Sequence, residues 1–202
     1  MCQQLANDPK QVHTFICASA IGAYPDSNVS MIESSKFGDG FLSEVVHDWE
    51  LATDPIRNTM RVCNARFGTV LHPFGGVMKR LGPLMKCGVL GAIGSGKQYV
   101  SWIGLDDAVR ALYFMMANSA FVGPINVVSP KPQSQLEWIK DWGRAMIRPT
   151  SIPLPEFAVD KVMGEMGNEL LLRSSNVLPK KLIDEHFQFQ CLSMKDICSL
   201  YY

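Results

Sequence analysis

Three polar residues lie at the end of an apolar stretch of the sequence or in the loop after it. The side chain of each could take part in catalysis or bind a ligand. Ser19 closes the apolar run at residues 12–17, and the carboxyl end of a buried parallel strand is where open α/β sheets bind ligands. Tyr24 follows in a loop, where its phenol could pass a proton or stack on a ring. Arg66 ends a second apolar run and could bind a phosphate. Each has a plainer alternative: a small strand-exit residue, a packing tyrosine, and a carboxylate partner.

A second group of candidates lies in the glycine-rich stretch at residues 94–102. Gly96 lets the backbone approach a ligand, and Lys97 offers a positive charge. Gln98 offers amide hydrogen bonds and Trp102 a stacking face, so these four residues are predicted to bind substrate. The alternative is a tight connecting loop. The four histidines have no metal-ligand spacing, and no metal site is predicted.

Composition and charge narrow the class of protein. The 202 residues are 47% hydrophobic, enough for one sizeable core with a small added lobe. The 19 basic and 19 acidic residues cancel, which argues against a nucleic-acid or membrane partner and favours a small-molecule substrate. The sequence shows neither a signal peptide nor an apolar stretch of about 20 residues, and its six cysteines show no C-x-x-C pair. A cytoplasmic protein with reduced thiols is expected.

The elements that must position these residues alternate along the chain. Buried strands are predicted at residues 12–17, 60–65 and 125–128, and helices at 41–52, 77–85 and 106–118. Ser134 and Glu137 form a capping box that starts a further helix, and Pro179 and Ser193 start two more. A helix to about residue 163 with a turn at Gly164 is also expected. This order predicts an α/β protein: a doubly wound parallel sheet with a small, mostly helical C-terminal lobe.

Two more specific predictions concern the helix at residues 106–118. Its periodicity predicts a buried face made of Val109, Leu112, Tyr113 and Met116. Asp106 and Asp107 lie in its first turn, where helix capping is favoured over a catalytic carboxylate pair, because adjacent helical side chains diverge.

Several stretches, taken in order, resemble one known family. They are residues 18–24 (ASAIGAY), 49–50 (WE), 66–71 (RFGTVL), 94–103 (GSGKQYVSWI), 106–107 (DD), 123–130 (GPINVVSP), 152–155 (IPLP), 178–179 (LP) and 187–189 (FQF). The sequence is similar to the atypical extended short-chain dehydrogenase/reductases of the nucleoside-diphosphate-sugar epimerase type, the cell-division-inhibitor homologues. The resemblance implies the second half of an NAD(P)-binding Rossmann-like domain at residues 1–130 and a small C-terminal domain of unknown function at 131–202.

The resemblance also implies a cofactor and where it would lie. NAD or NADP is expected beside Ser19, Arg66 and the segment from Gly68 to Pro73, with a nucleotide sugar as one candidate substrate. The family's glycine-rich dinucleotide loop is missing from the sequence, so binding of NAD or NADP by this chain alone is not expected. Three βα units, about 90 residues, would precede Val12 in the complete fold. A fragment, a truncated gene and a separately supplied N-terminal half are all open.

The superfamily transfers a proton through a Ser, a Tyr and a Lys, and at the aligned positions this sequence has other residues. Counting from Trp49-Glu50 and from Tyr24 places Ala20 at the serine position, Leu42 at the tyrosine position and Val46 at the lysine position. None of these side chains can carry a proton. Ser19 and Tyr24 are the remaining catalytic candidates. The sequence therefore predicts either an epimerase-like protein of doubtful activity or a non-catalytic binding or partner-interaction protein, a homo-oligomer included.

Overall fold

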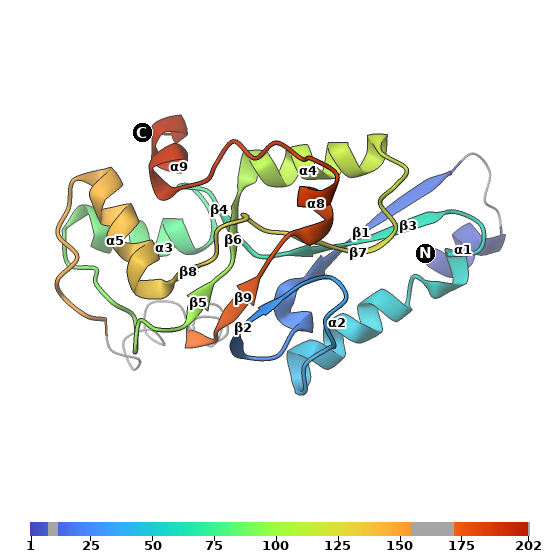
Figure 1. The fold of residues 1–202 in the computed structure, drawn as a ribbon, viewed down its shortest axis with the longest axis horizontal. Helices are drawn as coiled ribbons and strands as arrows, with labels where there is room; N and C mark the ends of the chain where they lie inside the picture. The colour runs from blue at the N-terminus through green and yellow to red at the C-terminus, as the bar shows by residue number, and fades with distance from the viewer. Residues whose placement is uncertain (8–11, 155–171, 202) are drawn as a thin grey trace.

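A parallel three-stranded sheet forms the centre of the molecule. The computed structural model describes residues 1–7, 12–154 and 172–201. The sheet contains β1 (Thr14–Ala20), β3 (Arg61–Phe67) and β7 (Gly123–Val127) in the order β1-β3-β7. Helix α2 (Phe41–Leu51) and helix α4 (Leu105–Ala117) lie on opposite sides of it (Figure 1). The α/β class and the three predicted strands are confirmed.

Short strand pairs and helices surround this sheet. The pairs are β2 (Ser27–Met31) with β9 (Ser175–Val177), β4 (Thr69–Leu71) with β6 (Trp102–Gly104), and β5 (Tyr99–Val100) with β8 (Gln133–Ser134). The helices are α1 (Cys2–Asn7), α3 (Gly76–Lys86), α5 (Gln135–Met146), α8 (Lys180–Asp184) and α9 (Met194–Tyr201), with 3₁₀ turns at Ile21–Ala23 and Asp54–Ile56. In the described part of the chain, no helix is long and apolar enough to cross a membrane. The helix expected up to residue 163 and the turn at Gly164 lie outside the described residues.

Two hydrophobic cores hold the fold together. One lies between the sheet and α4 and includes Ala65, Met115 and Ile125. The other joins α3, α5 and α9 around the indole rings of Trp102 and Trp138, and makes the helical lobe. Both cores draw residues from each side of position 130, and the division of the chain at that position stays a prediction.

Helix α4 buries a different face from the one predicted. Val109, Tyr113 and Met116 are 44%, 67% and 55% exposed, whereas Ala108 and Ala111 pack against the sheet. Of the predicted face, Leu112 does pack against the core between the sheet and α4. The other three positions are wrong because α4 is apolar nearly all round, and its small alanines let the helix approach the strands closely.

Asp107 has a role that differs from the predicted capping. Gly104 is the N-cap residue of α4, and no side chain caps this helix. Asp107 is instead fully buried and accepts hydrogen bonds from the backbone N–H groups of Gln190 and Cys191, at 3.0 and 2.8 Å. Arg110 pairs with the same carboxylate at 2.8 Å. The carboxylate thus ties the C-terminal segment to α4.

The capping box at the start of α5 is confirmed. The Ser134 hydroxyl accepts from the Glu137 N–H, and the Glu137 carboxylate accepts from the Ser134 N–H. Together these bonds satisfy two backbone donors at the end of the helix.

Replacing Ser134 by alanine should lower the free energy of unfolding by about 1 kcal/mol at about pH 7. The hydrogen bonds from Ser134 lower the pKa of Glu137, so this part of the stability is present above the ordinary glutamate pKa of about 4.3 and is lost as the pH falls through the lowered value. Urea unfolding at about pH 7 and about pH 3 measures it. An equal loss at both pH values would contradict a role for the ionised Glu137.

Candidate functional site

A pocket of about 440 Å³ opens at the carboxyl ends of β1 and β3. Ligands bind at this end of the strands in open parallel sheets, and the volume lies within the range of about 300–1,000 Å³ typical of small-molecule sites. The lining residues come from the exits of both strands, from α2, and from the segments beside β5 and β9: Ala20, Ile21, Gly22, Leu42, Val45, Val46, Trp49, Phe67, Gly68, Thr69, Tyr99, Val100, Ser101, Arg173 and Ser175.

The three positions aligned with the proton relay meet in this pocket. Ala20 ends β1, and Leu42 and Val46 project from α2 one helical turn apart, so that both reach the same cavity. The alignment of these three residues with the Ser, Tyr and Lys of the superfamily stays a prediction. Their side chains offer a water-excluding surface and no group that can exchange a proton.

The polar residues of β1 and β3 form a buried network instead. Glu50 accepts from the Ser19 hydroxyl at 2.7 Å and from two nitrogens of the Arg66 guanidinium, both at 2.7 Å. A third nitrogen of Arg66 donates to the Tyr24 hydroxyl at 2.9 Å, and that hydroxyl donates to the Asn126 side chain at 2.7 Å. Arg66 and Glu50 are only 2% and 8% exposed. The network joins the strands β1, β3 and β7 to α2.

The electrostatics of the network follow from its burial. Desolvation raises the pKa of Tyr24, more than the neighbouring Arg66 lowers it, so the phenol stays protonated and bound. Burial acts to lower the pKa of Arg66, but the hydrogen bonds and charge supplied by Glu50 and Tyr24 raise it overall. Both groups are fixed in one protonation state near neutral pH.

This geometry agrees with the plainer alternatives for Ser19, Tyr24 and Arg66. None of the three lines the pocket. Ser19 and Tyr24 are buried and bonded to protein partners, and Arg66 pairs with a carboxylate. Catalytic or cofactor-binding roles for these three residues stay a prediction. Sequence reasoning missed Glu50 as the centre of this network. Its signal was the helical spacing of Ser43, Val46 and Glu50, which places a carboxylate on the buried face of α2.

The predicted substrate loop is held by its own hydrogen bonds. Gln98 is buried and donates to the Ile93 carbonyl at 3.0 Å, while the carbonyl of Gly96 accepts from Leu136 at the start of α5. Trp102 is fully buried in the helical core, which excludes the predicted stacking face. Lys97 is exposed on the same loop, and its role toward a substrate stays a prediction.

Gly68 and Pro73 lie on the segment that leaves β3. Gly68 lines the pocket, whereas Pro73 is buried outside it. Gly68 is required by close packing: a Cβ atom there would lie 2.6 Å from the Ser101 carbonyl oxygen and 2.7 Å from a methyl of Val128. Cofactor contacts by either residue stay a prediction.

Replacing Gly68 by alanine should cost about 1–3 kcal/mol of unfolding free energy, because the added methyl forces two strands apart. Gly82 provides the matched control, since a Cβ atom there meets nothing within 4 Å. In the interior of α3, Gly82→Ala should stabilise the protein by about 0.5–1 kcal/mol. Thermal unfolding of both variants distinguishes strand crowding from a general effect of alanine.

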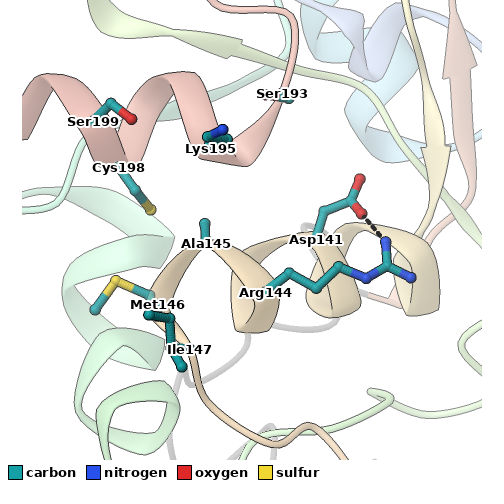
Figure 2. Close-up of a pocket in the computed structure, with 9 residues that line it drawn as sticks. All are labelled: Asp141, Arg144, Ala145, Met146, Ile147, Ser193, Lys195, Cys198 and Ser199. Atoms are coloured by element: carbon teal, nitrogen blue, oxygen red, sulfur yellow. Dashed lines mark hydrogen bonds and ion pairs between the residues drawn. The ribbon is translucent and has the colours of Figure 1, made fainter.

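A second hollow of about 880 Å³ lies between α5 and α9 (Figure 2). Its cations are on the surface: Arg144 is paired with Asp141 at 2.7 Å and its side chain is 76% exposed. Its lining includes Asp141, Lys195 and Cys198, and no residue from the ends of β1, β3 or β7 contributes to it. The described residues contain no cluster of three His, Cys, Asp or Glu side chains that could hold a metal.

A Rossmann-like parallel sheet with a pocket at its carboxyl edge is the architecture of the short-chain dehydrogenase/reductase class. A family model described as a domain of unknown function (DUF1731) matches residues 154–198. The chain is 42% identical over 180 residues to an epimerase family protein of Mycobacterium bovis, and 35% identical over 192 residues to the epimerase family protein YfhF of Bacillus subtilis. The chain belongs to this epimerase family.

The matches cover most of this chain but only part of each relative. They cover 88% and 94% of this chain but 60% and 62% of the two relatives, so the chain spans about three-fifths of their length. The crystal structure of the human epimerase family protein SDR39U1 (isoform 2) with NADPH matches with a TM-score of 0.86 at 26% identity. This match covers 98% of the chain and 70% of the human structure.

Proposed function

We propose that the pocket beside α2 is the substrate side of a nicotinamide-dependent site, in which the Ser/Tyr/Lys relay of the superfamily takes no part. The observation that carries this proposal is the meeting of Ala20, Leu42 and Val46 in one cavity at the strand ends. The human relative solved with NADPH supports NADP or NAD as the cofactor of the family site.

The described residues fit one end of such a cofactor. The side chains of Leu42 and Val46 give a flat apolar surface for a nicotinamide ring, and the backbone at Gly68 runs along the same cavity. When bound, the nicotinamide supplies hydride transfer. The chain's own residues exclude water and orient the reacting groups. A pyrophosphate needs a glycine-rich turn at a helix N-terminus, and the sequence contains no such motif, so that end must be bound by a part of the fold outside this chain.

Because this chain is proposed to contact only the nicotinamide end of the cofactor, we expect it to bind NADPH weakly. NADPH should bind this chain with a dissociation constant of about 1 mM or weaker, through its nicotinamide end. In an NMR titration the methyl signals of Leu42 and Val46 should shift with NADPH, whereas ADP-ribose, which lacks the nicotinamide, should leave them unchanged. Micromolar affinity, or equal shifts with ADP-ribose, would overturn the proposal.

A pair of variants makes the test specific for the pocket. Leu42→Trp fills the cavity and should abolish the NADPH-dependent shifts at Val46. Leu105→Trp makes the same change on the surface of α4, where Leu105 is 37% exposed, and should leave them intact.

A binding protein without turnover is the second candidate. It is favoured by the loss of every proton-transferring group at the relay positions and by the apolar stripe of Leu105, Val109, Tyr113 and Met116 on α4. A second copy of the chain could cover this stripe. Light scattering after size exclusion should then give a dimer that Val109→Glu dissociates. A folded monomer would count against this candidate.

A further inference from the structure

The lining of the pocket differs between α2 and the other segments. Helix α2 contributes Leu42, Val45, Val46 and Trp49, which offer no hydrogen-bonding group apart from the indole N–H. The rest of the lining includes Arg173 and the hydroxyl-bearing residues Thr69, Tyr99, Ser101 and Ser175. Most of the hydrogen-bonding groups of the pocket therefore come from the segments outside α2.

Tyr99 differs from its neighbour Ser101 in this lining. The Ser101 hydroxyl is used by the fold: it donates to the Ser175 carbonyl at 2.7 Å and accepts from the Val177 N–H at 2.8 Å. The backbone of Tyr99 is fixed by its pairing with Ser134 and by a 2.9 Å bond from its N–H to Ser174. Its phenol, by contrast, has no hydrogen-bond partner among residues 12–154 and 172–201. Tyr99 is therefore a positioned side chain with a spare donor and acceptor.

We infer that Tyr99 binds the oxygen of a compact, largely apolar ketone or alcohol whose hydrocarbon part lies against α2 beside the nicotinamide ring. The inference rests on the proposed function of the pocket and names its substrate class. A carbonyl or hydroxyl group is the form of substrate that a nicotinamide interconverts: the hydride is added to or removed from the carbon, and a proton is exchanged between the oxygen and solvent through the Tyr99 hydroxyl. The Tyr99 hydroxyl donates to that oxygen, and Thr69 lies within the same lining.

The same geometry argues against a nucleotide sugar at this position. A sugar ring presents hydroxyl groups on all sides, and a buried hydroxyl without a partner costs about 1–3 kcal/mol. Several such groups would face Leu42, Val45 and Val46. The apolar wall of α2 selects a hydrocarbon surface instead.

Two ligands of nearly equal shape test this inference: 2-acetylnaphthalene, which has a carbonyl oxygen, and 2-isopropenylnaphthalene, which has a methylene group there. Tyr99→Phe removes one hydroxyl and should weaken binding of the ketone about 3- to 10-fold, as expected for one net hydrogen bond. Binding of the hydrocarbon should change by less than about twofold. The control is Tyr113→Phe, the same change on the exposed surface of α4, which should alter neither affinity.

The outcomes separate this inference from the proposed function. If Tyr99→Phe weakens both ligands equally or neither, while NADPH still shifts Leu42 and Val46, the substrate class is wrong and the nicotinamide site stands. UDP-glucose binding more tightly than the ketone, with shifts at Leu42, would also overturn the substrate class. If NADPH and both naphthalenes leave the signals of Leu42 and Val46 unchanged, the proposed function fails as well.

Discussion

Replacing Arg66 by methionine should lower the free energy of unfolding by about 3–5 kcal/mol, the largest loss expected from a single substitution in this chain. The guanidinium is buried, and its removal leaves the Glu50 carboxylate with only the Ser19 hydroxyl as a side-chain donor. Tyr24 loses a donor at the same time. Urea unfolding followed by circular dichroism measures the change.

The matched experiment removes both charges. In the double variant Glu50→Leu/Arg66→Met neither charge of this pair is left buried without its partner, and most of the stability should return, because replacing a whole buried ion pair by apolar side chains is often neutral. Arg144→Met provides the control for losing an arginine, since its pair with Asp141 is exposed and should contribute less than about 1 kcal/mol. A loss below about 1 kcal/mol for Arg66→Met would show that the network does not hold the strands to α2.

The second large effect is expected at Asp107. Asp107→Ala should cost about 2–4 kcal/mol, since the buried N–H of Cys191 and the part-buried N–H of Gln190 lose a charged acceptor and Arg110 loses its partner. Because the carboxylate fixes the segment before α9, backbone hydrogen exchange should rise at residues 190–191 more than in the sheet.

The neighbouring carboxylate is the natural control. Asp106 is exposed and binds only the Tyr201 hydroxyl, so Asp106→Ala should cost less than about 1 kcal/mol. Equal losses at the two positions would mean that the buried contacts of Asp107 add nothing. Such a result would favour the simpler view of both residues as acidic groups near the start of a helix.

The sequence by itself determined the features that depend on neighbours along the chain. Runs of apolar residues predicted β1, β3 and β7, and the spacing of Ser134 and Glu137 predicted the start of α5. Counting from Trp49-Glu50 assigns Leu42 and Val46 to the relay positions, and this assignment stays a prediction. The strand and capping predictions succeeded because strand burial and helix capping are local properties, set within a few residues.

The tertiary structure decided which of those residues face a ligand. Ser19 and Glu50 are 31 positions apart, and Tyr24 and Asn126 are 102 apart. No local pattern in the sequence could therefore reveal that these side chains are hydrogen-bonded to one another. Trp102 had the chemistry of a stacking residue, but the helical lobe buries it completely. Long-range packing decides which of several side chains with equal local signals become buried, and here it buries Glu50 and Arg66 and leaves the apolar side chains of α2 lining the pocket.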